Sequence, residues 1–360
     1  MKNPTILVTG ATGKTGGAVA MQLLAKGYAV RALVRSRDKR SEQLYRMGAE
    51  IAVADLFDPE QLTQALQGTQ RAYYLPIIHP YMIQSATAFA IAAGEAKLEA
   101  IVQISQWTSS LSHPSLHTRQ IWLVDQLFAN IPGVAHTIVN PGMFADNFLR
   151  VVDFASLLGF FPILMGKSRS APVANEDIAR VAVAVLLDPE RHDGKRYRPS
   201  GSQLLSGYDM AAIVQKVLGK RVLPVEMPMW LFYKVAQQQG VDPFLISSLR
   251  YYVEDNKMGT FSWNGGTSDA ILELTGEPAE DFETTVRRYL AMPFAKPTMT
   301  NRLRALVNFL MIPFYPGYNP ERYDRRMRFP MPTQPKFCLS SERWRAEHSP
   351  QVAVLSDRKV

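Results

Sequence analysis

The stretch VTGATGKTGG, residues 8–17, holds residues whose types and spacing could bind a phosphate. It contains the letters GKT that end a P-loop, and its glycines at 10, 13 and 16 match a dinucleotide-binding turn. A P-loop needs another glycine five residues before the glycine of GK, so that a wide loop of amides surrounds a triphosphate. That position is Val8, inside the apolar run TILV. The loop is too short for a triphosphate, and we predict that it binds the pyrophosphate of a nicotinamide cofactor.

Each glycine has its own physical reason in such a turn. Gly10 permits the tight turn, Gly13 lets the backbone approach the pyrophosphate, and Gly16 lets the next helix pack on the strand. The N-terminus of that helix would face the pyrophosphate. A structural glycine turn that binds nothing is the alternative. Thr12, Lys14 and Thr15 complete the predicted cofactor-binding loop, in which Lys14 and Thr15 would be ordinary loop residues rather than parts of a P-loop.

A basic turn, RSRDKR, follows the second apolar run. NAD binders place a carboxylate there for the ribose 2′-hydroxyl, whereas a guanidinium forks onto the 2′-phosphate of NADP. The run ends in Arg35, with Arg37 and Lys39 as helpers, so we predict NADP(H) over NAD(H). Asp38 could instead bind a ribose 2′-hydroxyl, which leaves NAD(H) as an alternative cofactor. A solvated basic turn that binds no cofactor is the other alternative.

Later strand ends predict the remaining adenosine contacts. Asp55 ends the run IAVAD, where it would meet the adenine. Leu75 and Pro76 end the next apolar run, where they would flank the adenine ribose.

Alternating apolar runs and helical patterns must position these residues. The predicted strands are 5–10, 29–35, 50–55, 71–76, 100–105 and 136–141, and the helices between them are 16–27, 39–48, 59–68, 82–97 and 119–130. This βα alternation predicts an α/β fold, a doubly wound parallel (Rossmann) sheet, with its site beyond the carboxyl ends of the strands.

The rhythm changes after Pro141, and we predict three parts. Residues 1–155 form the NAD(P)-binding Rossmann domain. Residues 156–294 form a smaller, mostly helical substrate lobe; the family resemblance given below implies that it is interleaved, with 175–200 returning to the Rossmann core. Residues 295–360 form a basic, aromatic, proline-rich C-terminal tail.

Composition narrows the class of protein. The 360 residues are 47% hydrophobic, which is enough for a sizeable core, and no apolar run reaches the roughly 20 residues of a membrane span. The first strand begins close to Met1, which leaves no room for a signal peptide. Cys338 is the only cysteine, so no intrachain disulfide is possible. A reactive thiol is one interpretation of Cys338, and an inert cysteine in the tail is the alternative. We therefore expect a cytoplasmic protein.

The charge lies mainly in the tail. Residues 295–360 hold twelve Lys and Arg against five Asp and Glu, or +7 of the net +8. The tail could bind a protein partner or a membrane surface through its arginines, or wrap its own body. No nucleic-acid module and no metal-ligand spacing among the six histidines is present, so we predict no direct nucleic-acid contact and no metal. The oligomeric state stays open.

The stretches ILVTGATGKTGGAVAMQLLAKGYAVRALVR, HTIVNPGMFADNFL and NEDIARVAVAVLLDPERHDGKRY together resemble the NmrA-like group of atypical short-chain dehydrogenases/reductases. The likeness covers about residues 1–290. It implies cofactor binding and an interleaved substrate lobe. It also places Pro141, Gly142 and Phe144 near the nicotinamide, with Asn147 close by. The group contains both reductases and cofactor-sensing regulators.

One departure concerns proton transfer. The wider superfamily uses a Tyr-x-x-x-Lys pair, but the matching helix reads LHTRQIWLVDQL, with Ile121 where a lysine is expected. Ser105, at the end of the fifth strand, and His117 are the candidates to replace that pair, with His113 as a looser one. Each of the first two candidates has a purely structural alternative. Ser105 would then only cap the end of its strand, and His117 would only be a solvent-exposed residue at the start of a helix.

Two functions remain open. The first is an NADPH-dependent reductase of a flat electrophile such as a quinone, whose reduced form needs no strong protein acid. An apolar lobe around Phe154, Phe160, Phe161 and Trp230 suits such a substrate. The second is a non-enzymatic NADP(H)-binding sensor that acts through a protein partner.

Overall fold

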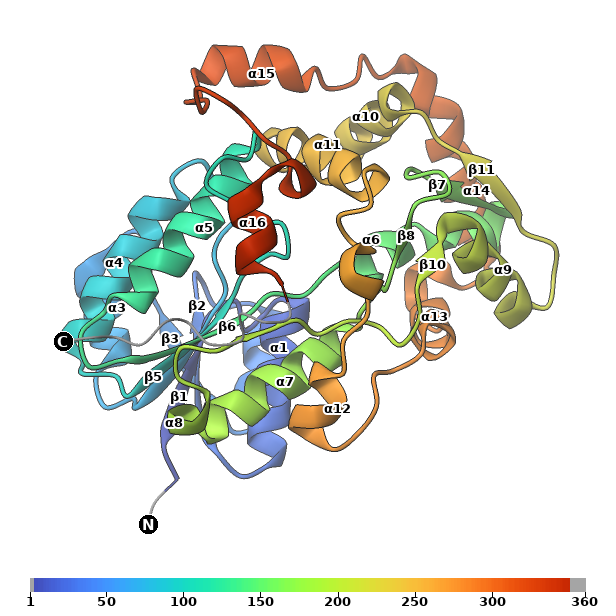
Figure 1. The fold of residues 1–360 in the computed structure, drawn as a ribbon. Helices are drawn as coiled ribbons and strands as arrows, with labels where there is room; N and C mark the ends of the chain where they lie inside the picture. The colour runs from blue at the N-terminus through green and yellow to red at the C-terminus, as the bar shows by residue number, and fades with distance from the viewer. Residues whose placement is uncertain (1–2, 350–360) are drawn as a thin grey trace.

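The computed structural model describes residues 3–349 and has a seven-stranded parallel sheet at its centre (Figure 1). The strand order is β3-β2-β1-β4-β5-β6-β9. The strands are β1 Thr5–Val8, β2 Ala29–Val34, β3 Glu50–Val53, β4 Arg71–Tyr74, β5 Ala100–Ile104, β6 Ala135–Val139 and β9 Arg196–Tyr197. This confirms the predicted doubly wound fold. The order reverses between β1 and β4, which is where such sheets bind ligands.

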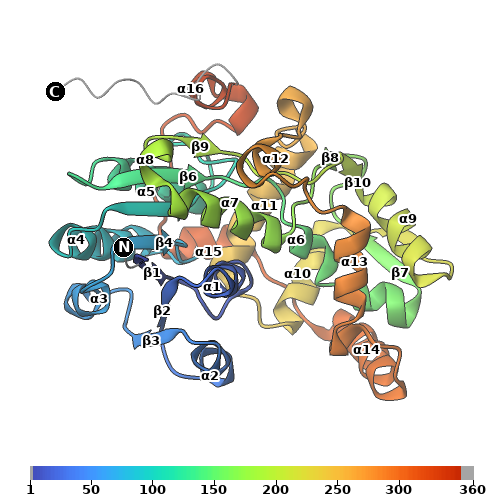
Figure 2. The same ribbon diagram turned by 90° about the horizontal axis from the view of Figure 1, so that it is seen from below.

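Helices cover both faces of the sheet, because alternate strand residues bury their side chains on opposite sides. In β1, Ile6 and Val8 join one core, and Leu7 joins the other. Figure 2 looks along the sheet and shows α3, α4 and α5 on one face and α1 and α7 on the other. The helices of this domain are α1 Lys14–Ala25, α2 Lys39–Arg46, α3 Pro59–Leu66, α4 Met82–Glu95, α5 Leu116–Ala129, α7 Asn175–Leu187 and α8 Pro189–His192.

A smaller lobe with its own hydrophobic core lies beyond α1 and α7 (Figure 2). It combines helices with two small two-stranded sheets, β7 with β11 and β8 with β10. Its strands are β7 Phe160–Ile163, β8 Arg169–Ser170, β10 Leu205–Ser206 and β11 Leu223–Glu226. Its helices are α6 Ala145–Leu149, α9 Gly207–Leu218, α10 Met229–Gln238, α11 Pro243–Lys257, α13 Phe282–Leu290 and the π-helical turn η1 Phe154–Leu158. The short α12 Ala270–Thr275 packs on α7.

The C-terminal segment runs back across the molecule. It contains α14 Met299–Met311, the turn η4 Ile312–Phe314, α15 Pro320–Met327 and α16 Glu342–Glu347. Figure 1 shows α15 crossing one end of the molecule, and α16 returns beside α5, where Arg343 lies over the Trp122 ring at 4.5 Å. Cys338 and Trp344 are buried there with Trp107 in a common cluster. Within residues 3–349, no helix is long and apolar enough to cross a membrane.

Candidate functional site

The glycine loop links the end of β1 to the start of α1. Gly10 has φ +61°, in the left-handed region that favours glycine, and its carbonyl accepts a hydrogen bond of 2.8 Å from the Gly13 amide. A Cβ on Gly16 would lie 2.4 Å from the Gly10 carbonyl oxygen, so only glycine lets α1 start this close to the strand. Gly13 caps α1, and no side chain bonds its first amides. Those amides are therefore open to an anion.

Lys14 and Thr15 are the first two residues of α1, so the expectation that they are ordinary loop residues is wrong. The Lys14 ammonium pairs with the Asp146 carboxylate and lies 3.3 Å from the Tyr289 hydroxyl. The Thr15 hydroxyl donates to the Asn175 side-chain oxygen at 2.7 Å. Lys14 thus ties the cofactor loop to the smaller lobe, and Thr15 ties it to α7.

Asp146 is the acidic centre of this link. It also accepts hydrogen bonds from the Tyr289 hydroxyl and, at 3.1 Å, from Arg150. Burial raises the pKa of Asp146, but the hydrogen bonds from Lys14 and Tyr289 and the charges of Lys14 and Arg150 together hold it below its ordinary value. The carboxylate is therefore ionised at neutral pH. Sequence reasoning missed Asp146 and Tyr289, because they lie far along the chain from the loop they hold.

The basic turn after β2 leaves its cations free. Arg35, Arg37 and Lys39 are exposed and make no hydrogen bond or ion pair within residues 3–349. Asp38 is instead occupied: it caps α2 through the Arg40 and Ser41 amides and pairs with the Arg40 guanidinium at 2.6 Å. The Ser41 hydrogen bond, ahead of the interactions with Arg40, lowers the pKa of Asp38. A carboxylate held this way is poorly placed to serve a ribose 2′-hydroxyl.

Arg40 is a further residue that sequence reasoning did not single out. Its guanidinium donates to the Thr12 carbonyl at 3.2 Å, which connects the basic turn to the glycine loop. Asp55 is exposed after β3, and its carboxylate accepts from the Phe57 amide at 3.0 Å. Leu75 follows β4 beside the loop, where its amide donates to the Thr9 hydroxyl at 2.8 Å. Pro76 is buried next to it. The predicted adenosine contacts therefore gather at one edge of the sheet.

The segment after β6 separates the sheet from the smaller lobe. Pro141 and Gly142 are buried, and Phe144 is partly buried, paired with Val173 in an isolated bridge. The Gly142 carbonyl accepts a hydrogen bond of 3.3 Å from the Tyr252 hydroxyl of α11. This segment leads directly into α6, which carries Asp146.

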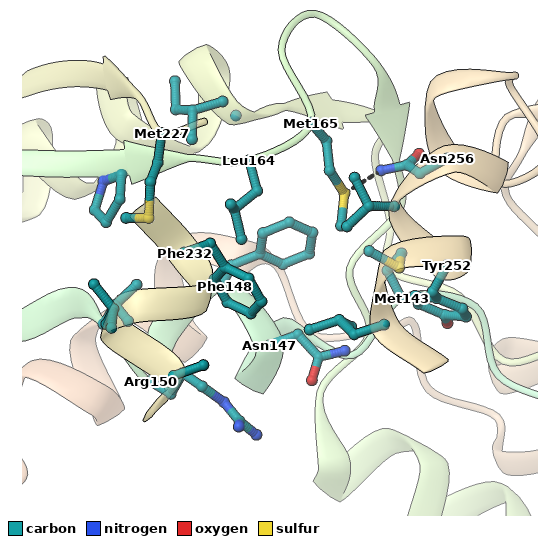
Figure 3. Close-up of a pocket in the computed structure, with 18 of the residues that line it drawn as sticks. Met143, Asn147, Phe148, Arg150, Leu164, Met165, Met227, Phe232, Tyr252 and Asn256 are labelled. Atoms are coloured by element: carbon teal, nitrogen blue, oxygen red, sulfur yellow. Dashed lines mark hydrogen bonds between the residues drawn. The ribbon is translucent and has the colours of Figure 1, made fainter. Parts of the chain in front are cut away.

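A mostly apolar pocket of about 230 Å³ begins on the same segment. Figure 3 shows Phe148 and Phe232 side by side within it, with Asn147 and Arg150 at one side. Helix α6 links the pocket to the glycine loop, because it supplies both the Asp146 partner of Lys14 and two of the lining side chains, Asn147 and Phe148. Further lining residues include Ile78, Met143, Leu164, Met165, Met227, Tyr252 and Asn256.

The aromatic residues expected around this pocket divide into two groups. Phe154 and Phe161 line it. Phe160 instead packs between Phe154 and Phe309 in tilted contacts, at 5.3 and 5.6 Å between ring centroids. Trp230 points outward from α10 and is 61% exposed, whereas Phe232 of the same helix faces the pocket.

Ser105 follows β5 as predicted, but its hydroxyl is used inside the fold. It donates to the Asp125 carboxylate at 2.8 Å, and Asp125 also accepts from Ser109 and Gln103. Burial raises the pKa of Asp125, while the charge of Arg196 and the three hydrogen bonds oppose that effect. Ser105 is not among the described residues that line the pocket.

His117 is buried at the start of α5 rather than solvated. Its Nε2 lies 2.8 Å from the Gln106 amide nitrogen, and its Nδ1 has no hydrogen-bond partner within residues 3–349. Burial lowers the pKa of His117 to about 4, so the ring is neutral at pH 7. Like Ser105, it lies outside the described lining of the pocket.

The looser candidate, His113, belongs to a buried cluster with Asp255 and Cys338. His113 Nε2 lies 2.6 Å from the Asp255 carboxylate, and the Cys338 thiol donates to the Thr108 carbonyl at 3.5 Å. Burial, with the nearby Asp255 charge, raises the pKa of the Cys338 thiol. The ligand atoms are close enough for a metal, but each has a protein partner, so we assign the cluster a role in docking the tail.

Tyr252 is the pocket hydroxyl that sequence reasoning missed. It lies on α11, more than a hundred residues from the segment after β6, and it lines the pocket beside Met143. Burial raises the pKa of Tyr252, followed by the charges of Asp255 and Cys338. The phenol is therefore neutral and can donate a hydrogen bond. A tyrosine in a long helical pattern carries no local signal of this role.

The fold described so far agrees with comparisons to known proteins. The NmrA-like family model matches residues 2–275, so the chain belongs to the NmrA-like family. An NAD(P)H azoreductase of Xenophilus azovorans is 28% identical over 287 residues, covering 79% of this chain and 98% of the relative. Quinone oxidoreductase 2 of Escherichia coli is 28% identical over 225 residues, covering 60% of this chain and 76% of the relative.

Solved structures show the same fold. The E. coli quinone oxidoreductase complexed with NADPH has a TM-score of 0.66 and 22% identity, covering 79% of this chain and 99% of that one. The Citrobacter sp. triphenylmethane reductase has a TM-score of 0.67 and 23% identity, covering 80% of this chain and 100% of that one. Distant relatives of this chain are thus NAD(P)H-dependent reductases, and related structures contain NADPH or NADP(H).

Proposed function

We propose that this protein is an NADPH-dependent reductase of a flat, electrophilic small molecule, with quinones as the substrate class. The observation that carries the proposal is the mostly apolar pocket, lined by Phe148 and Phe232, which helix α6 links to the glycine loop through Asp146 and Lys14. Flat aromatic rings fit between such side chains, whereas a sugar or a charged substrate would leave polar groups unpaired.

Two features of the chain suit the predicted cofactor. The uncapped amides of α1 suit its pyrophosphate, and the free guanidinium of Arg35 suits a 2′-phosphate. When bound, NADPH supplies a hydride. A quinone gains that hydride and one proton from solvent to give the hydroquinone, which balances the two electrons transferred.

The chain's own residues would bind and orient the substrate. The apolar lining excludes water, and the neutral Tyr252 phenol lines the pocket and donates to the Gly142 carbonyl of the segment after β6. A quinone needs no strong protein acid, which fits a site where Ser105 is bonded to Asp125 and His117 is buried and neutral.

The same two residues favour the second candidate, an NADP(H)-binding sensor without turnover. A site without an available proton donor could bind cofactor and change partner contacts rather than reduce a substrate. The two candidates differ in a single measurement, the oxidation of NADPH in the presence of an acceptor.

The test mixes the purified full chain with NADPH and 1,4-naphthoquinone and follows the nicotinamide absorbance. We expect turnover, and we expect Phe232→Ala to raise KM about tenfold through loss of one aromatic contact. Trp230→Ala, on the outer side of the same helix, is the matched control and should leave KM unchanged. NADPH binding by calorimetry without any quinone turnover would overturn the reductase proposal and support the sensor.

A further inference from the structure

Helix α14 exposes an apolar face that no other part of the described residues 3–349 covers. Met299 is 80%, Leu303 64% and Leu310 58% exposed, and Phe314 in the following turn is 78% exposed. Ala305 is the buried residue of this helix. Large side chains this exposed on one element mark an interaction surface.

The spacing of these residues gathers them on one side. Positions 299, 303, 306, 307 and 310 follow the i, i+4, i+7, i+8, i+11 pattern of a single helix face. Leu306 and Val307, at 45% and 49% exposed, complete that face. Residues outside this face hold the helix on the lobe: Asn301 donates to the Pro293 carbonyl at 2.8 Å, and Phe309 packs on Phe160.

Cations border this face, and no acid is near it in the sequence. Arg302 and Arg304 fall on opposite sides of the apolar face at 100° per residue, and both are exposed. Residues 284–320 contain no Asp or Glu. An apolar stripe between arginines is complementary to a surface whose interior is apolar and whose outer groups are anionic.

We propose that α14 is an interfacial helix that docks this protein on an anionic lipid bilayer. With 13 residues, it is too short to span a bilayer but long enough to lie in the plane of the headgroups. Leu303 and Leu310 would enter the acyl boundary, and Arg302 and Arg304 would contact lipid phosphates. Figure 2 shows α14 at the outer edge of the lobe, where a flat surface can reach it.

Two observations favour a bilayer over another protein. The exposed face is the convex side of a single helix, whereas helix-binding sites on proteins are grooves that fit a helix lying within them. The helix also lies outside residues 2–275, which the NmrA-like family model matches, so it adds a surface to a shared reductase fold. Binding of α14 to a bilayer does not require that the protein reduce a quinone.

The experiment is co-sedimentation of the full chain with vesicles of phosphatidylcholine, with and without a quarter of phosphatidylglycerol. We expect at least tenfold stronger partitioning to the anionic vesicles. The double variant L303E/L310E should lose at least tenfold of that binding with an unchanged thermal melt, because both side chains are exposed.

Two further variants separate the contributions. I91E/L272E adds the same charges at residues 51% and 48% exposed on other elements, and should bind as the unmodified chain does. R302Q/R304Q should weaken binding to the anionic vesicles about tenfold and leave weak binding to neutral ones unchanged. Absence of vesicle binding would overturn the proposal. So would a dimer in solution, measured by light scattering, that L303E/L310E dissociates.

Discussion

Arg35 decides the predicted choice of cofactor at the scale of single residues. It stands after the last residue of β2, is exposed and has no partner within residues 3–349. We expect Arg35→Glu to lower the preference for NADPH over NADH by at least tenfold, because a charge-assisted bidentate contact contributes about 1.5–3 kcal/mol. The measurement is calorimetric titration with both cofactors.

Arg46→Glu is the control, because it makes the same change of charge on α2 at a residue already paired with Glu42. It should leave the preference unchanged. A preference that survives Arg35→Glu would mean that other cations hold the 2′-phosphate, with Arg37 and Lys39 the next candidates.

His117 makes stability depend on pH. Its pKa falls from 6.5 to about 4 on burial, so the unfolded chain binds more protons between these values and the free energy of unfolding falls as the pH is lowered. Between pH 7 and 5 this costs on the order of 2 kcal/mol. Urea unfolding should show that loss to be smaller by this amount in His117→Gln.

The comparison of the two proteins removes other contributions, because His192 and His348, whose pKa values burial also lowers, are present in both. Equal losses in the two proteins would show that His117 titrates normally in the folded chain.

The elements show which parts of the site a sequence can predict. The strands, helices and glycine loop follow from local patterns, since a Cβ at Gly16 meets backbone atoms only six and seven residues away. All six strands predicted in the first half of the chain are present. The Asp146–Lys14 and Tyr252–Gly142 contacts join residues more than a hundred positions apart, and no local periodicity encodes them.

The burial of His117 also depends on residues that lie far from it in the sequence. A histidine at the start of a helix is expected to be solvated, but Phe244 of α11 packs edge-on against its ring at 6.1 Å. Arg119, two residues later, donates to the Pro330 carbonyl of the C-terminal segment. The start of α5 is covered by elements that follow it by more than a hundred residues, so its environment is set by tertiary packing rather than by helix position.

At the scale of the whole molecule, the C-terminal segment closes the carboxyl edge of the sheet. Arg198, next to the edge strand β9, lies over the Trp107 ring at 3.6 Å, and burial lowers the pKa of Arg198 to about 10. Trp107 donates to the Thr260 carbonyl and accepts from Trp344 through its own carbonyl. The loop that follows Ser105 is therefore held between the body and the tail.

Trp344 is the side chain that fastens the tail, and its truncation tests whether this closure stabilises the whole fold. It is 1% exposed and packs with the rings of Trp107 and Trp263 at centroid distances of 5.5 and 5.2 Å. Trp344→Ala should lower the free energy of unfolding by about 3–5 kcal/mol, the usual range for emptying a buried aromatic site. It should also open new tryptic cleavage after Lys336 and Arg343, measured by limited proteolysis with mass spectrometry. Trp230→Ala, the same substitution at an exposed site, is the control and should change neither the stability nor the cleavage pattern. A Trp344→Ala protein that is as stable as this control would show that the tail contacts the body without stabilising it.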